Sequence, residues 1–200
     1  MGMIIYMMGK SSTGKDTIYK KLLQNDRLKL KAVILYTTRP RRIKETDGVE
    51  YHFVDEQAYE ALKKQGKIIE ERAYETFHGL WRYFTVDDGK LNLEKENYLI
   101  IGTLESYQKT KEYFGEKYML PVMVETDDAE RLLRAIKREK KQEKPKYEEL
   151  CRRFLADSED FSEEKIEKAG IGRRFLNNND DLDNCLNEIE NYILERCIIN

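Results

Sequence analysis

The sequence predicts an α/β protein in which helices flank a parallel sheet, and two observations support that fold class. Residues 3–8, MIIYMM, form a compact apolar run that ends at a glycine, as expected of a strand buried on both faces. Further short apolar runs alternate with stretches whose apolar residues recur at helical spacing. A length of 200 residues suits a single domain with one sizeable core.

The predicted elements follow one another in a regular order. After the first strand, Ile18, Leu22 and Leu23 recur at helical spacing among lysines, which predicts a loop and then a helix over residues 16–24. Short apolar or aromatic runs predict further strands at residues 32–36, 51–54, 98–101, 120–124 and 175–176. Amphipathic stretches predict further helices at residues 56–65, 106–113, 127–141, 147–155 and 182–198.

Two segments interrupt this alternation. Residues 68–85 mix strand-like and aromatic side chains around Gly79, and the turn signal Asp87-Asp88-Gly89 follows them, which predicts a hairpin or a small lobe. Residues 140–146 form a charged break that contains a proline and separates two predicted helices. We expect these two helices to form a mobile flap.

The composition limits the function classes and the compartment. Charged residues are abundant, yet the formal net charge is −2, so we expect neither a nucleic-acid partner nor a membrane surface. The apolar run at residues 3–8 is far too short to span a membrane. Cys151, Cys185 and Cys197 show neither metal-binding nor disulfide spacing. We therefore expect a soluble cytoplasmic protein, with monomer and homo-oligomer both open.

The segment GKSSTGKDT has the spacing of a phosphate-binding loop. Its glycines stand at the fixed ends of G-x-x-x-x-G-K, a pattern in which backbone N–H groups wrap around phosphates and the lysine adds a positive charge. The alternative is a glycine-rich turn that merely joins a strand to a helix. The candidate phosphate-binding residues are Gly9, Lys10, Ser11, Ser12, Thr13, Gly14, Lys15, Asp16 and Thr17.

Asp16 stands where the usual pattern has Ser or Thr. Phosphates repel a carboxylate unless it points away or acts through a hydrated Mg²⁺, so Asp16 cannot simply replace a hydroxyl ligand. Thr17 offers a hydroxyl one place later. We expect Mg²⁺ to be held mainly through water and the nucleotide phosphates, with Thr17 or Asp16 as the protein's contribution.

A second signal lies in YTTRPRRIKETDGVEYHFV, residues 36–54. Arg39, Arg42, Glu45, Gly48 and Tyr51 recur there at intervals of three. Guanidinium groups bind phosphate oxygens through paired donors, and a phenol adds another hydrogen bond, so this segment could hold a second, acceptor phosphate. The alternative is a charged surface loop.

The chain resembles the guanylate kinase family, whose motif T-T-R-x-x-R-x-x-E-x-x-G-x-x-Y-x-F is matched from Thr37 to Phe53. The resemblance extends over essentially the whole chain and implies a three-layer P-loop NTPase fold. It divides the single domain into a core (residues 1–35, 89–125 and 157–200), a monophosphate-binding lobe inserted at about residues 36–88, and a helical lid at about residues 126–156.

The resemblance also implies a role for each candidate residue. The triphosphate of ATP would lie on residues 9–17, with Asn179 near the adenine. The GMP-binding residues would be Arg39, Arg42, Tyr51, Glu70, Tyr83, Thr85 and Thr103. Lys15, Arg39 and Arg42 would share the catalytic task with the lid arginines Arg134, Arg138 and Arg153.

The chain departs from the family pattern where guanine is read. Leu35 stands in place of a serine, and the expected Asp-x-Asp at the end of the central strand is replaced by a segment with Gly102, Thr103 and Glu105. Phosphate-holding groups are kept more fully than base-reading groups. The leading hypothesis is transfer of the γ-phosphoryl group of ATP to GMP with Mg²⁺, and the alternatives are a different phosphorylated acceptor or an inactive binding module.

Overall fold

The computed structural model describes residues 1–76, 79–178 and 181–197, and its main sheet is parallel. The strands β2 (Leu30–Ala32), β7 (Asn97–Ile101), β1 (Ile4–Met8), β8 (Met119–Glu125) and β9 (Arg174–Leu176) lie side by side in that order. The central strand β1 is buried along its whole length. This arrangement explains why its sequence is continuously apolar rather than alternating.

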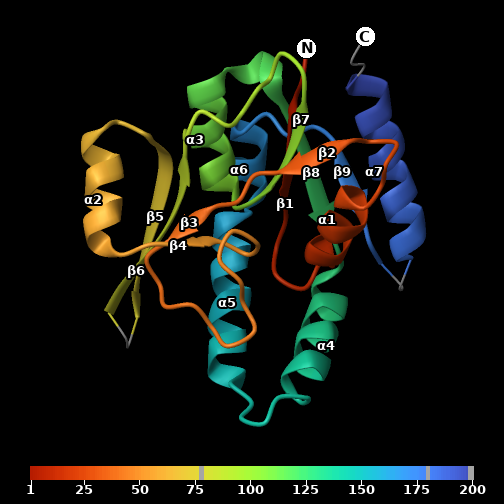
Figure 1. Ribbon diagram of the computed structural model, residues 1–200. Helices are drawn as coiled ribbons and strands as arrows, with labels where there is room; N and C mark the ends of the chain where they lie inside the picture. The colour runs from red at the N-terminus through yellow and green to blue at the C-terminus, as the bar shows by residue number, and fades with distance from the viewer. Residues whose placement is uncertain (77–78, 179–180, 198–200) are drawn as a thin grey trace.

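Helices cover both faces of this sheet (Figure 1). The side chains of β1 alternate between the faces: Ile5 and Met7 pack against α1 (Lys15–Leu23) and α7 (Leu182–Arg196). Ile4, Tyr6 and Met8 pack against α3 (Leu104–Phe114) and α6 (Glu163–Lys168) on the other side. A 3₁₀ turn, η1 (Glu116–Tyr118), leads into β8. The predicted fold class, a three-layer α/β arrangement around a parallel sheet, is confirmed.

A second sheet is formed by the chain between β2 and β7. Its strands are β4 (His52–Phe53), β3 (Tyr36–Thr37), β6 (Gly79–Val86) and β5 (Ile68–Thr76), in that order. β5 and β6 are antiparallel, so the predicted hairpin is confirmed. The helix α2 (Glu56–Lys64) begins at the N-cap Asp55 and packs Tyr59 against Phe84 and Val86.

Two helices extend from the carboxyl end of the main sheet. Figure 1 shows α4 (Asp128–Glu139) and α5 (Tyr147–Asp160) side by side, joined by a turn at the point farthest from the sheet. α4 begins directly after β8, with the Asp127 carboxylate accepting hydrogen bonds from the first-turn N–H groups. Among the described residues, no helix is long and apolar enough to cross a membrane.

The structure corrects two predicted elements and adds one that was not predicted. The strand expected at residues 32–36 is divided, because the chain crosses there from one sheet to the other: the Val33 N–H donates to the Leu99 carbonyl in the main sheet, while the Leu35 carbonyl accepts from the His52 N–H in the second. The helix expected at residues 147–155 continues to Asp160. The short helix α6 was not predicted, since its single buried apolar residue, Ile166, gives no periodic pattern.

Candidate active site

The phosphate-binding loop lies between the end of β1 and the start of α1. Gly9 and Gly14 have φ values of 150° and 86°, which disfavour any residue with a side chain. A Cβ atom at Gly9 would overlap the Val124 carbonyl, and one at Gly14 would overlap the side-chain nitrogen of Asn177. The two fixed glycines of the motif are therefore required both by their backbone conformation and by the close approach of β8 and of the Asn177 side chain.

Internal hydrogen bonds hold the loop in shape. The Thr13 hydroxyl donates to the Lys10 carbonyl (3.0 Å), and Asn177 Nδ2 donates to the Thr13 carbonyl (2.7 Å). Lys15 Nζ lies 3.4 Å from the Lys10 carbonyl, within the curve of the loop. Asn177 was missed by the sequence analysis, although its place directly after β9 in the run of three asparagines was a usable signal. Asn179, the predicted adenine neighbour, lies outside the described residues.

A cavity of about 450 Å³ opens beside the loop. Lys15, Asp16 and Thr17 line one side of it, and Asp16 and Thr17 are exposed in the first turn of α1. The described residues hold no cluster of three His, Cys, Asp or Glu side chains that could bind a metal ion. A divalent cation here would therefore need phosphate oxygens or water to complete its coordination, and the oxygen donors of Asp16 and Thr17 suit Mg²⁺.

Two of the predicted lid arginines reach this cavity from α4. Arg134 and Arg138 line it opposite Lys15. Arg134 Nη2 donates to the Asn177 carbonyl (3.0 Å) and to Glu130 (2.5 Å), which fixes the guanidinium beside the loop. Positive groups from two elements thus face the same space, an arrangement suited to a polyanionic ligand.

The third lid arginine approaches from α5. Arg153 lies 3.5 Å from Glu149 on its own helix and lines a smaller cavity between α5 and the loop residues Ser11 and Ser12. Arg138 lines both cavities. The structure thus brings the predicted lid residues to the phosphate-binding loop from two different helices.

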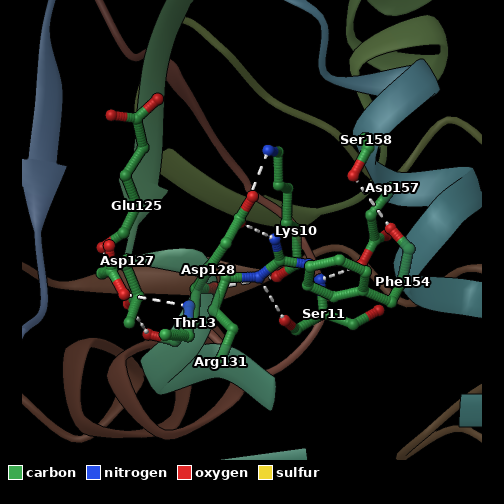
Figure 2. A network of polar contacts seen from close by, with 12 residues as sticks. Lys10, Ser11, Thr13, Glu125, Asp127, Asp128, Arg131, Phe154, Asp157 and Ser158 are labelled. Atoms are coloured by element: carbon green, nitrogen blue, oxygen red, sulfur yellow. Dashed lines mark hydrogen bonds and ion pairs between the residues drawn. The ribbon is translucent and has the colours of Figure 1, made fainter. Parts of the chain in front are cut away.

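A network around Ser11 was not predicted (Figure 2). Arg131 on α4 is fully buried; its Nε donates to the Ser11 carbonyl (2.9 Å) and its Nη2 to Asp157 on α5 (2.9 Å). Asp157 also accepts the Ser11 N–H (2.7 Å), while Asp128 pairs with Arg131 Nη1 and Phe154 stacks 4.9 Å from its guanidinium carbon. The spacing of Arg131, three residues before Arg134, places both on one helix face and was the available signal.

On the second sheet, the motif arginine Arg39 is buried and already paired. Its two terminal nitrogens donate to the Glu45 carboxylate at 2.7 and 2.6 Å, and the rings of Tyr51 and Phe53 lie 5.2 and 5.3 Å from its guanidinium carbon. Hydrogen bonds from Arg39 lower the pKa of Glu45 to about 2. The Arg42 N–H donates to Glu45 as well, and the Arg42 side chain is exposed. Glu45 therefore orients the guanidinium of Arg39 and fixes the backbone at Arg42.

The predicted acceptor-binding residues Glu70, Tyr83 and Thr85 lie on the hairpin of the second sheet. Glu70 is buried, and its carboxylate accepts from the Thr85 hydroxyl (2.7 Å) and from Arg72 Nε (3.1 Å) and Nη2 (3.3 Å). Tyr83 lies opposite Arg72 in the hairpin and meets the Tyr51 ring edge-on at 5.6 Å. Arg72 was not predicted as a site residue, and it leaves Glu70 with fewer lone pairs for a ligand than the sequence suggested.

Gly102 follows the end of β7, and there is no room for a side chain at this position. A Cβ atom there would overlap the Tyr6 hydroxyl, which donates to Ser106 (2.6 Å), and burial raises the pKa of that phenol. Thr103, predicted as a GMP contact, is the N-cap of α3, where its hydroxyl accepts the Ser106 N–H at 3.2 Å. The phenol of Tyr6 thus fills the space beside the strand end where the resemblance led us to expect an acidic pair.

Comparisons with known proteins identify the family to which the chain is similar. The guanylate kinase family model matches residues 1–80. The chain is 30% identical over 212 residues to a guanylate kinase of Mycoplasma mobile, with 98% of this chain and 93% of that protein covered. A guanylate kinase of Caldanaerobacter subterraneus is 27% identical over 199 residues, with 98% and 89% covered.

The chain also matches one relative over part of its length and one solved structure over nearly all of it. A guanylate kinase of Brucella melitensis is 37% identical over 82 residues, so in this match 40% of the chain spans 37% of that relative's length. The crystal structure of a guanylate kinase from Anaplasma phagocytophilum matches with a TM-score of 0.62 and 20% identity, covering 98% of this chain and 87% of that one. That likeness concerns the fold.

Proposed function

Because the chain belongs to the guanylate kinase family, we propose that it transfers the γ-phosphoryl group of ATP to GMP and so produces GDP and ADP. The observation that carries the proposal is the shared cavity of Lys15, Arg134 and Arg138 beside the phosphate-binding loop. A lysine and two arginines around a glycine-rich loop are what a transferring phosphoryl group needs, because the reaction depends on positioning and on neutralising oxygen charge.

The donor side is formed by residues 9–17. The ATP phosphates lie along the loop, where backbone N–H groups and the positive end of α1 oppose their charge. Lys15 stabilises the β and γ phosphates from within the curve of the loop. Asp16 and Thr17 would hold Mg²⁺ together with water and phosphate oxygens, and the ion would supply further neutralisation of the phosphate charge.

The acceptor side is formed by the second sheet. Arg42, with its exposed side chain, and the Tyr51 hydroxyl bind the GMP phosphate, and Arg39 contributes the donors that Glu45 leaves available. Four further residues contact the guanine base or line the edge of its pocket: Glu70, Tyr83, Thr85 and Thr103. Because Arg72 already pairs with Glu70, the choice of base depends on how this pair presents the remaining carboxylate lone pairs to the acceptor.

The lid arginines stabilise the phosphoryl group during its transfer. Arg134, Arg138 and Arg153 neutralise the charge of the transferring phosphoryl group, and α4 and α5 exclude water, which would otherwise compete as the acceptor. We place the reaction in the cytoplasm, where Cys151, Cys185 and Cys197 would remain reduced, as they are in the structure.

The test is ADP release from the purified protein with Mg·ATP and one acceptor at a time. The panel contains GMP, dGMP, AMP, UMP, CMP, dTMP and a blank without acceptor. We expect turnover of GMP, and a loss of at least about 100-fold in kcat for Lys15→Ala with a modest change in acceptor binding. Lys20→Ala, an exposed change on the same helix, is the matched control. Unchanged ADP release by Lys15→Ala would refute the assignment.

A further inference from the structure

The carboxylate of Asp157 lies where the phosphate-binding loop offers a hydrogen bond to an anion. Asp157 belongs to α5, yet its Oδ2 accepts the Ser11 N–H at 2.7 Å across the space between lid and loop (Figure 2). Backbone N–H groups of such a loop are the donors that hold phosphate oxygens. The Asp157 carboxylate therefore occupies the Ser11 N–H, a donor that an incoming phosphate could use.

Arg131 is the second donor to this carboxylate. The same Asp157 oxygen that accepts from Ser11 also accepts from Arg131 Nη2 at 2.9 Å. A backbone N–H and a guanidinium that converge on one oxygen form the kind of pair that binds a phosphate oxygen through charge-assisted hydrogen bonds. Arg131 is 1% exposed and is held by the Ser11 carbonyl, Asp128 and the Phe154 ring. Its guanidinium is therefore already in position before any ligand binds.

Three guanidinium groups lie around Asp157. The small cavity beside it is lined by Arg131, Arg138 and Arg153 together with Ser11 and Ser12. Among the described residues, the buried Ser12 hydroxyl has no hydrogen-bond partner, which leaves a further polar group at the same place. The cavity holds about 20 Å³, enough for one water molecule but too little for a phosphoryl group while Asp157 remains.

We propose that Asp157 is an internal substitute for a phosphoryl oxygen, and that Arg131 is a phosphoryl-binding residue in addition to the three lid arginines of the proposed mechanism. The terminal phosphate of the donor displaces Asp157 from Ser11 and Arg131. The displacement frees α5 from the loop, so binding of the donor changes the contact between lid and loop. The inference rests on the proposed function only for the identity of the donor as a nucleoside triphosphate.

The charge of Asp157 should weaken binding of every polyphosphate at this site. Asp157→Asn keeps an oxygen that can accept the Ser11 N–H but removes the negative charge, so affinity should rise by about tenfold at low salt. Asp157→Ala removes the competing acceptor as well and should bind at least as tightly as Asp157→Asn. The gain should shrink as ionic strength rises. Arg131→Met should bind polyphosphate more weakly than the unaltered protein.

Calorimetric titration with inorganic tripolyphosphate and with ATP, in the absence of acceptor, measures these affinities directly. The matched control is Glu159→Gln, which removes the same charge from the exposed side of the same helix. Hydrogen exchange of the Ser11 amide gives a second readout, since Asp157→Ala should exchange faster without ligand and become protected when tripolyphosphate binds. Thermal unfolding confirms that each variant is folded.

The outcomes separate this inference from the proposed function. Tighter binding in Asp157→Asn and Asp157→Ala, with Glu159→Gln unchanged, supports the substitution of carboxylate for phosphate. Equal or weaker binding in both Asp157 variants, or equal tightening in Glu159→Gln, would overturn it. A protein that binds ATP in this pattern but transfers phosphate to no acceptor would refute the kinase assignment and leave the role of Asp157 intact.

Discussion

Replacing Gly14 by alanine tests whether the loop depends on contact with Asn177 or only on a glycine backbone. At Gly14 the φ angle is 86°, and an added Cβ would overlap Asn177 Nδ2. The strain of the left-handed backbone costs about 1–2 kcal/mol. Asn177 is buried, so moving its side chain also breaks its hydrogen bond to the Thr13 carbonyl, which adds about 1–2 kcal/mol. The free energy of unfolding should fall by about 2–4 kcal/mol.

The control for this substitution is Gly66→Ala. Gly66 has a similar φ of 68°, but an added Cβ would meet no atom within 4 Å. Its replacement should cost only the backbone strain of about 1–2 kcal/mol. Urea unfolding of both variants gives the difference, and calorimetric titration should show weaker ATP binding for Gly14→Ala alone. Equal stability losses in the two variants would refute the contact argument.

Two further predictions concern buried pairs of the second sheet. The folded-state pKa of Glu45, about 2 against an ordinary 4.5, means that its pairing with Arg39 stabilises the protein above pH 4.5 and is lost as the pH falls toward 2. Between pH 6 and pH 3 the unfolding free energy of the unaltered protein should fall by about 1–2 kcal/mol more than that of Glu45→Gln; parallel curves would contradict this. Arg72→Met leaves the buried Glu70 carboxylate unpaired and should cost about 3–5 kcal/mol in urea unfolding, most of it recovered by adding Glu70→Gln. Strict additivity of the two changes would show that the pair is not coupled.

The parts that the sequence predicted are those whose signal is local. The phosphate-binding loop follows from the spacing of Gly9, Gly14 and Lys15, because each glycine position has a backbone angle that favours glycine. The strand β1 follows from an apolar run, since a central parallel strand is buried on both faces. Such features need no knowledge of distant residues.

The contacts that were missed join segments far apart in the chain. Asp157 meets Ser11 across 146 positions, and Asn177 meets Thr13 across 164, so no spacing rule could pair them. The cap formed by Thr103 was missed for another reason: a threonine hydroxyl suits a ligand contact as well as a helix cap, and the cap is identified only once the start of α3 is known. Neither the Glu70–Arg72 pair nor the divided strand at residues 32–36 has a distinctive sequence pattern.

The two sides of the site differ in how charge is arranged before any substrate binds. On the acceptor side, Glu45 neutralises Arg39 and Arg72 neutralises Glu70, so each buried charge already has a partner. On the donor side, Asp157 lies among the lid arginines and accepts hydrogen bonds from the Ser11 N–H and from Arg131 Nη2. A donor polyphosphate can therefore compete with the Asp157 carboxylate for these two donors, whereas an acceptor binds beside ion pairs that are already formed. The affinity for ATP should accordingly respond to the charge at Asp157, and the choice of acceptor should respond to the pairing of Glu70.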